Sequence, residues 1–400
     1  MKLLIITDAF PPSRTSAAVH MHDLSLELVE QGHSVTVVVP VEINGQSLII
    51  ENSNGFRLVS VLAPKIKDIG YLRRAFAELF LPYAIYHRLK SSVIFNESFD
   101  GIIWYSPTIF WGSLISRLKI KFKCRTYLVL RDIFPDWAVD LGLMKKRISY
   151  YFLKIIECNQ YRVASRIGIQ SPGNLKYFNG RMLKRFKPKV ELLWTWVTPN
   201  NQAVKCSIDL KKTHLAGREI FVYAGNMGKA QDFDLIINLV ELLSNRDDIG
   251  FVFVGRGSEV GRLKALVNKK PIENILFFDE IDSAEIPALY HQCKVGLVAL
   301  DPRHKSNNIP GKFLSYMASG LPVLARLNPG NDLVDIIENH NVGASYIGSD
   351  VNEFKEIAIG LIEILKVDQY LSSRCKNLAN NLFSTKKAVK QILETLEFDH

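Results

Sequence analysis

Residues 219–254, EIFVYAGNMGKAQDFDLIINLVELLSNRDDIGFVFV, contain two short apolar runs separated by a glycine-containing loop and a helical pattern. The runs at 220–223 and 250–254 have the β-branched, apolar character of buried parallel strands. The residues between them, at 234–244, predict a helix. This stretch is therefore predicted to be a β-α-β unit, the repeating element of a parallel sheet that helices cover on both faces.

The same alternation continues in both directions along the chain. Further strands are expected at 3–6, 35–39, 57–62, 101–105, 126–130, 166–170, 275–278, 295–300 and 323–325, and further helices at 18–30, 260–267, 284–293 and 312–319. We therefore predict an α/β protein with two doubly wound, Rossmann-like domains, at 1–198 and 199–400, whose terminal helices finish the second domain or pack back on the first. Because ligands bind at the carboxyl ends of such strands, we expect a cleft between the domains.

Composition narrows the class of protein. The chain has 400 residues, 48% hydrophobic and 22% charged, which excludes a disordered or collagen-like protein. Its five cysteines show no C-x-x-C spacing, which argues against a disulfide framework and a zinc cluster. The apolar run at 3–6 is too short for an export signal, and no run is long enough to cross a membrane. We expect a cytoplasmic protein.

The positive charge lies almost entirely in the first half, where residues 1–200 have 27 Lys and Arg against 15 Asp and Glu. A basic domain beside a neutral one favours an anionic partner surface such as a membrane leaflet, with a lysine-rich solvated surface as the alternative. The candidate membrane contacts, which lie among apolar residues, are Arg73, Arg74, Arg88, Lys90, Lys119, Lys121 and Lys123. Nucleic acid is not expected, because aromatic residues do not alternate with the basic runs.

Two loops of the second half have the features of phosphate sites. Gly225 and Gly228 precede a helix and are followed by Lys229, so backbone amides and a full charge could bind an anion. The stretch 304–325, HKSNNIPGKFLSYMASGLPVLA, opens a helix at Lys312 after a loop of asparagine, proline and glycine. A plain turn and an ordinary capped helix are the alternatives. Two such loops in one domain suggest a diphosphate ligand.

These motifs together resemble a known family. The FPP segment at 10–12 with Gly32-His33, the segment RDIFPD at 131–136, the loop GNMGKAQ at 225–231 and the segment from Pro310 to Val323 are similar to those of the retaining family 4 glycosyltransferases of GT-B architecture. The resemblance covers about residues 2–385. Within the family the chain resembles the branch that builds bacterial O-antigen and capsule units, including L-fucosamine transferases.

The resemblance implies donor-binding positions across the chain, several of which depart from the common pattern. Thr15 and Ser16 replace paired glycines, Asn226 and Gln231 stand where an arginine and a lysine are common, and Asn307 and Ser315 replace two glutamates. The further donor-binding candidates are Gly225, Gly228, Lys229, Arg256, Phe278, Glu280, Ile281, Asn308, Ile309, Pro310, Gly311 and Lys312.

The catalytic candidates lie in the first half. Arg131 and Asp132 occupy the place of a His-Asp pair that lies near the reacting sugar in the family. Asp8 directly follows the first strand, and His20 lies on the first helix, so either could position an acceptor. Capping of a turn by Asp8 and simple packing of His20 are the alternatives.

The resemblance implies a hexosyltransferase-type enzyme that moves a sugar from a UDP-sugar, with UDP-N-acetyl-L-fucosamine as one candidate, to a polyprenyl-diphosphate-linked acceptor with retention. It would work at the inner face of the bacterial inner membrane, in O-antigen or capsule assembly. No cofactor beyond the UDP-sugar and no metal is expected, because no Asp-x-Asp pair lies wholly on a predicted loop; the pair at 232–234 runs into the helix predicted at 234–244. The alternatives are a UDP-sugar epimerase of the same fold and a catalytically inactive partner subunit.

Overall fold

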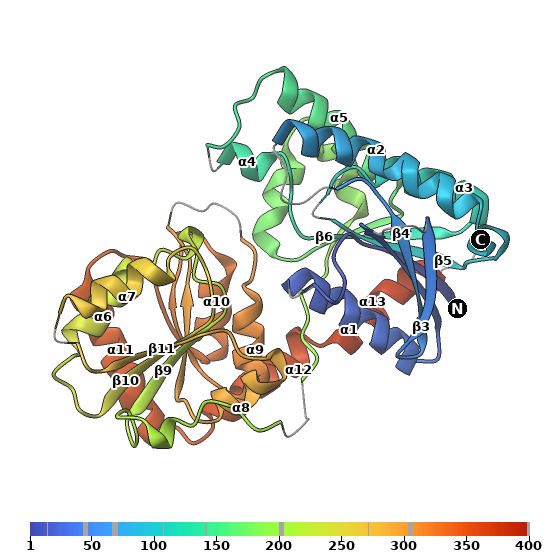
Figure 1. Cartoon of the computed structure of the whole chain (residues 1–400). Coiled ribbons are helices and arrows are strands. Elements are labelled where there is room, and N and C mark those ends of the chain that lie inside the picture. Colours follow the sequence, from blue (N-terminus) through green and yellow to red (C-terminus); the bar gives the residue numbers. More distant parts are fainter. Residues whose placement is uncertain are drawn as a thin grey trace. The chain divides into compact units, whose positions relative to one another are not determined.

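The computed structural model describes residues 1–13, 15–42, 47–65, 71–106, 108–140, 142–199, 204–270, 272–302 and 307–397, without the side chains of 71–76 and 230. The chain divides into two compact units (Figure 1). Unit 1 comprises Met1–Trp196 with Thr385–His400, and unit 2 comprises Val197–Ser384. The last helix of the chain therefore belongs to the first unit.

Unit 1 contains an eight-stranded sheet in the order β3-β4-β2-β1-β5-β6-β7-β8. All neighbouring strands are parallel except β3, which pairs antiparallel with β4. Its strands are β1 (Lys2–Ile6), β2 (Ser34–Val41), β3 (Leu48–Ser53), β4 (Phe56–Leu62), β5 (Gly101–Ser106), β6 (Arg125–Leu130), β7 (Arg166–Ile169) and β8 (Val190–Leu192). Its helices are α1 (Ser16–Glu30), α2 (Tyr71–Lys90), α3 (Gly112–Phe122), α4 (Asp136–Asp140), α5 (Ile148–Val163) and α13 (Thr385–Glu397).

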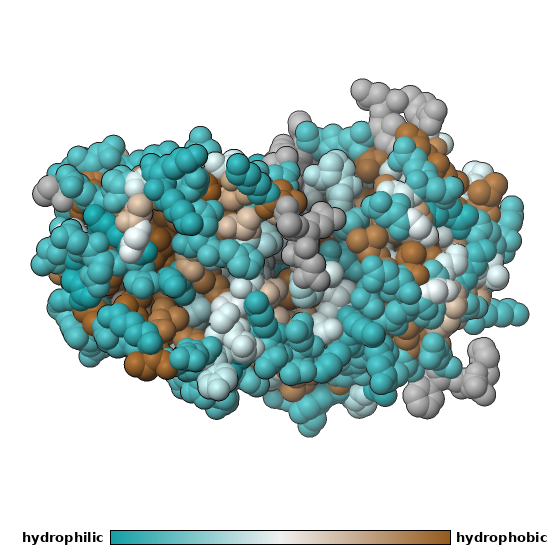
Figure 2. Space-filling model, turned by 90° about the horizontal axis from the view of Figure 1, so that it is seen from below, coloured by the Kyte–Doolittle hydropathy of each residue, from teal (hydrophilic) through white to brown (hydrophobic). Residues whose placement is uncertain are grey.

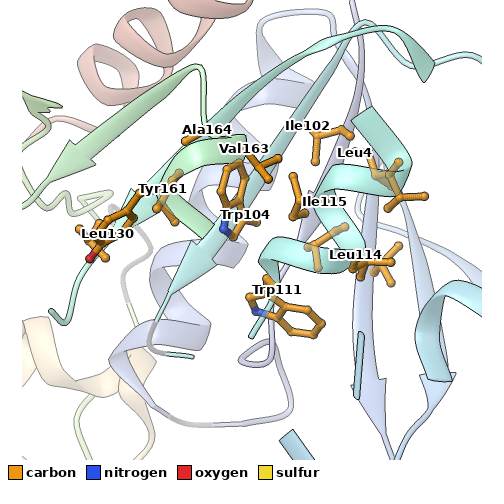
Figure 3. Close-up of a cluster of buried hydrophobic side chains, with 14 of the residues drawn as sticks. Leu4, Ile102, Trp104, Trp111, Leu114, Ile115, Leu130, Tyr161, Val163 and Ala164 are labelled. Atoms are coloured by element: carbon orange, nitrogen blue, oxygen red, sulfur yellow. The ribbon is translucent and has the colours of Figure 1, made fainter. Parts of the chain in front are cut away.

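Alternating side chains of the unit 1 strands form a core on each face of the sheet. Leu4 and Ile6 pack on one side with residues of α2, α3 and α5, and Trp104, Trp111 and neighbouring side chains of this cluster are drawn in Figure 3. Leu3 and Ile5 point to the opposite side, where α1 and α13 cover them. The molecular face shown in Figure 2 is largely hydrophilic, with hydrophobic residues in small groups.

Unit 2 contains a six-stranded parallel sheet in the order β11-β10-β9-β12-β13-β14. Its strands are β9 (Glu219–Ala224), β10 (Ile249–Val254), β11 (Ile275–Phe278), β12 (Val295–Ala299), β13 (Val323–Arg326) and β14 (Gly343–Tyr346). Its helices are α6 (Asp234–Leu242), α7 (Val260–Asn268), α8 (Ile286–Tyr290), α9 (Gly311–Ser319), α10 (Asp332–His340), α11 (Val351–Val367) and α12 (Leu371–Leu382).

The predicted α/β class with two doubly wound sheets is confirmed. The strand order reverses at β1 in unit 1 and at β9 in unit 2, because consecutive connections leave these strands toward opposite edges. Ligands in such sheets bind at the carboxyl ends of the strands beside this reversal. A binding site is therefore expected in the loops after β1, β5 and β6 and in those after β9, β10 and β12.

Candidate active site

Two glycine-containing loops of unit 2 are joined backbone to backbone. The amide of Gly225, directly after β9, donates to the carbonyl of Val254 at 2.9 Å, and Met227 donates to Arg256 at 2.7 Å. A Cβ atom on Gly255 would lie 2.1 Å from the oxygen of Gly225, and Gly255 has a φ of +143°. Only glycine allows the loop after β10 to approach the loop after β9 this closely.

Lys312 brings a third loop, the one after β12, to the same place. Its Nζ lies 4.6 Å from the ring centre of Tyr223, on β9, and its Cε would lie 3.8 Å from a Cβ on Gly225. Within the described ranges, no carboxylate forms an ion pair with it. Burial lowers the pKa of Lys312 to about 8. The lysine is the second residue of α9, and the N-cap residue of this helix, Pro310, provides no side-chain hydrogen bond. Helix dipole and lysine charge therefore favour an anion here.

Some groups that were expected to bind the donor already form hydrogen bonds within the chain. The amide of Gly228 donates to Oε1 of Gln231 at 2.9 Å, and residues Lys229–Gln231 form a single 3-10 turn in place of a helix start. Lys229 is exposed. The Ser315 hydroxyl donates to the carbonyl of Gly311, one turn earlier in α9, at 3.2 Å. The Gly228 amide can bind a phosphate only after Gln231 moves. Because Lys229 is exposed whereas Lys312 lies beside Tyr223 and Gly225, Lys312 is the better placed of the two lysines.

The remaining donor-binding candidates of unit 2 lie around these loops. Arg256 forms an exposed ion pair with Glu280 at 3.3 Å, and the carbonyl of Phe278 accepts from the amide of Gly255 at 3.1 Å. Asn307 and Ile309 are buried, whereas Asn226 and Ile281 are more accessible. Asn308, Pro310 and Gly311 complete the segment that enters α9. Their roles in binding stay predictions.

A second polar cluster lies at the carboxyl ends of β1, β5 and β6 in unit 1. Arg131 donates through Nη1 to the hydroxyl of Tyr105, on β5, at 3.0 Å. Burial raises the pKa of Tyr105 to about 12, with Arg131 opposing the shift and Asp132 and Asp8 adding to it. Burial works against the charge of Arg131, but Tyr105 and Asp132 outweigh it and raise the pKa of the guanidinium. The cluster therefore holds a permanent cation beside two carboxylates.

His20 lies close to this cluster but is buried, with 6% of its surface exposed. Its ring packs against Trp196 with centroids 5.7 Å apart, and the Nε1 of Trp196 donates to the His20 carbonyl at 3.0 Å. Burial, followed by the charge of Arg131, lowers the pKa of His20 to about 3. The imidazole is therefore neutral at physiological pH, and its Nδ1 has no hydrogen-bond partner among the described residues. The neutral ring can form a hydrogen bond, but its low pKa makes it a poor proton acceptor, and it cannot neutralise a phosphate.

Thr15 has a structural role that the sequence pattern did not predict. Its hydroxyl caps α1 by accepting from the amide of Ala18 at 3.3 Å, and the partly buried Ser16 is the first residue of that helix.

Thr15→Ala is expected to lower the stability of the protein by about 1 kcal/mol, since the cap is lost, while leaving UDP affinity unchanged. Thermal unfolding and UDP calorimetry measure the two effects, with Thr15→Ser as the matched control because serine keeps the capping hydroxyl. A loss of UDP affinity at unchanged stability would instead make Thr15 a donor contact.

Sequence reasoning missed three polar groups of unit 1, namely Tyr105 in the cluster itself, Trp196 beside His20 and Lys154 beside Asp136. Tyr105 lies in the apolar run GIIWYS and Trp196 in LLWTW, so both look like ordinary core residues. Lys154 lies on α5 and is 3% exposed. Its inward direction could not have been predicted, because the apolar residues at 148, 151, 152 and 155 predict that a different face of the helix is the buried one.

Several predicted membrane contacts are used inside unit 1. Lys119 donates to the carbonyl of Val163 at 3.0 Å, Arg88 donates to that of Ala84 at 3.2 Å, and Lys121 lies 4.9 Å from the ring centre of Phe95. Lys90 and Lys123 are exposed. The side chains of Arg73 and Arg74 lie outside the described residues. Where the structure is described, it contains neither a helix long and apolar enough to cross a membrane nor a group of three side chains suited to a metal ion.

Comparison with known proteins identifies relatives of this fold. Residues 218–364, within unit 2, match the family described as "Glycosyl transferases group 1". The chain is 24% identical over 236 residues to a probable glycosyltransferase, WbjE, of Pseudomonas aeruginosa, a match that covers 56% of this chain and 57% of WbjE. It is 21% identical over 346 residues to a putative colanic acid biosynthesis glycosyl transferase, WcaI, of Escherichia coli, covering 80% and 82% of the two chains. The family match and these named relatives support a transferase enzyme.

Solved structures agree on the fold. Sucrose-phosphate synthase from Thermosynechococcus elongatus superimposes with a TM-score of 0.75 at 14% identity and covers 98% of both chains. Anabaena HepE in complex with UDP-glucose gives a TM-score of 0.67 at 13% identity and covers 99% of both chains. The structural neighbours are GT-B glycosyltransferases, so the predicted GT-B architecture is confirmed.

Proposed function

We propose that this protein is a retaining glycosyltransferase that transfers a sugar from a UDP-sugar to a polyprenyl-diphosphate-linked sugar. The observation that carries the proposal is the meeting of Lys312, the start of α9 and the loop after β9, because a cation and helix amides there suit a diphosphate. This site lies in the segment that matches glycosyl transferases group 1. The UDP-glucose bound to the structural neighbour HepE supports a uridine nucleotide as the donor.

The two units would have separate tasks in this reaction. Unit 2 would bind the UDP-sugar, and the cation of Lys312 would stabilise the charge that develops on the departing UDP. In unit 1, Arg131, Asp132 and Asp8 would position the acceptor hydroxyl. Retention needs no protein nucleophile if the leaving phosphate itself takes the proton of the acceptor. Residues of this chain would then act by positioning and by charge.

The acceptor and the pathway are proposed from the named relatives. WcaI is named for colanic acid biosynthesis, which favours a polysaccharide built on a lipid carrier. Unit 1 contains the positive excess of the chain, which favours action at the inner face of the bacterial inner membrane during O-antigen or capsule assembly. UDP-N-acetyl-L-fucosamine is the first donor sugar to test.

Isothermal titration with UDP tests the donor site. We expect saturable UDP binding that is stronger than GDP binding and unchanged by removal of Mg²⁺. Transfer is then assayed with UDP-sugars and a polyprenyl-diphosphate sugar. Release of UDP without any lipid acceptor would favour an epimerase, and failure to bind any nucleotide would favour an inactive partner subunit.

A further inference from the structure

The outer face of α5 is apolar and exposed. Ile148, Tyr151, Phe152 and Ile155 share one side of the helix because they lie at i, i+3, i+4 and i+7. Each is more than half exposed, and Ile148 reaches 89%. Leu143, shortly before the helix, is 72% exposed. No other stretch of thirteen described residues exposes as many large hydrophobic side chains. This surface, residues 143–155 without the inward-facing side chains, is named the α5 face below.

The charge next to the α5 face has one sign. Lys145, Lys146 and Arg147 are consecutive and exposed, and they lie between Leu143 and Ile148. From 141 to 156 the sequence contains no Asp or Glu. Apolar side chains bordered by cations complement an anionic bilayer, in which the apolar groups enter the interface and the cations meet lipid phosphates. A neutral protein surface would offer the three cations no such partner.

The inner face of α5 holds the loop that contains the unit 1 candidates. Lys154 donates to Oδ2 of Asp136 at 2.6 Å and also pairs with the buried Glu157. The hydroxyl of Tyr150 donates to the other oxygen of Asp136 at 2.9 Å. Asp136 ends the segment that begins with Arg131 and Asp132. Helix α5 and the three residues before it therefore present an apolar, basic surface outward, and the inner face of the helix fixes the candidate acceptor loop.

We propose that the α5 face, with Lys145, Lys146 and Arg147, is the surface by which this protein docks on an anionic lipid bilayer. The inference rests on the proposed function, because a lipid-linked acceptor is what makes docking beside the 131–136 loop useful. It places the docking surface on α5, where the exposed apolar residues gather, and not on α3, whose Lys119 donates to the carbonyl of Val163. Docking through α5 would bring the acceptor loop to the membrane at the point where the lipid carrier leaves the bilayer.

Co-sedimentation with phosphatidylcholine vesicles, with and without phosphatidylglycerol, tests the proposal. The wild-type protein should bind only the anionic vesicles. Replacing Lys145, Lys146 and Arg147 by Gln should weaken binding about 100-fold, since each cation contributes about 1 kcal/mol near such a surface. The triple change Ile148→Gln, Phe152→Gln and Ile155→Gln should weaken binding at least as much. UDP affinity should stay unchanged in both variants.

A matched control keeps the test specific. Ile364, Val367 and Tyr370 of unit 2 are also exposed, so replacing these three by Gln removes the same kind of surface elsewhere. This control should bind vesicles like the wild type, and circular dichroism checks that all variants remain folded. The proposal would be overturned if the control lost as much vesicle binding as the α5 variants, or if the α5 variants bound vesicles like the wild type.

Two further outcomes separate lipid docking from self-association and from the donor site. A dimer that the triple α5 variant loses in sedimentation equilibrium, without vesicle binding by the wild type, would make the α5 face a contact between copies of the chain and overturn lipid docking. Vesicle binding without any nucleotide binding would support the docking surface while overturning the proposed donor site. Nucleotide binding without vesicle binding would support the donor site and overturn the docking surface.

Discussion

Lys312→Ala should weaken UDP binding about 10- to 100-fold, because a hydrogen bond to a charged group contributes about 1.5 to 3 kcal/mol. The lysine lies over Tyr223 and beside Gly225 without a carboxylate partner among the described residues, so its charge is available to a diphosphate. Isothermal titration with UDP measures the effect. Lys269→Ala, which removes an exposed lysine after α7, is the control and should bind UDP like the wild type.

The same lysine predicts the pH dependence of UDP binding. Burial lowers the pKa of Lys312 to about 8, so the side chain is charged below this pH and loses its proton above it. An anionic ligand binds the charged form, and UDP affinity should therefore fall as the pH rises from about 7 to about 9. Lys312→Arg should bind UDP without this decline, because arginine keeps its proton throughout the range. An equal decline in the Arg variant would assign the pH dependence to another group.

Lys229→Ala distinguishes between the two lysines that the sequence offered. Lys229 is exposed and follows a glycine whose amide is already bonded to Gln231, so its loss should change UDP affinity less than the loss of Lys312. Isothermal titration of Lys229→Ala and Lys312→Ala with UDP shows which variant loses more affinity. The opposite order would mean that UDP displaces Gln231 and binds the 225–231 loop first.

Most of unit 2 could be predicted from its sequence because the strands next to the reversal are apolar and the turns contain glycine. The strand β14 was missed, since its residues GASY are small and show no apolar run. In unit 1 the strands β8 and β3 were also missed. The first has only three residues, and the second has the mixed pattern LIIENS. These edge strands acquire their structure from pairing with a neighbour, which local sequence does not encode.

The loops that form the candidate site could be predicted from the sequence, whereas the contacts of their side chains could be predicted only in part. The strand reversal at β1 and β9 identifies the loops after β1, β9 and β12, and these contain Asp8, Gly225 and Lys312. The contact between Gln231 and the Gly228 amide could not be foreseen, because either a ligand or a side chain can satisfy such an amide. Tyr105 was hidden because a strand buried on both faces is apolar whether or not its last residues line a site.

Gly255→Ala should destabilise unit 2 by about 3 kcal/mol or more and abolish UDP binding. The new Cβ would lie 2.1 Å from the oxygen of Gly225, and the φ of +143° is one that alanine rarely adopts. Since the atom in the way is backbone, relief requires the loop after β9 to move from its position beside Lys312. Hydrogen exchange over residues 219–260 and UDP titration measure the two losses.

Gly261→Ala is the matched control for this change. Gly261 lies in α7, six residues after Gly255, and a Cβ there would meet no atom within 4 Å. Alanine is the better helix former, so this variant should gain about 0.5 kcal/mol and bind UDP like the wild type. If Gly255→Ala behaved like Gly261→Ala, the close approach of the two loops would be dispensable. The donor site would then depend on the cation of Lys312 and the start of α9 alone.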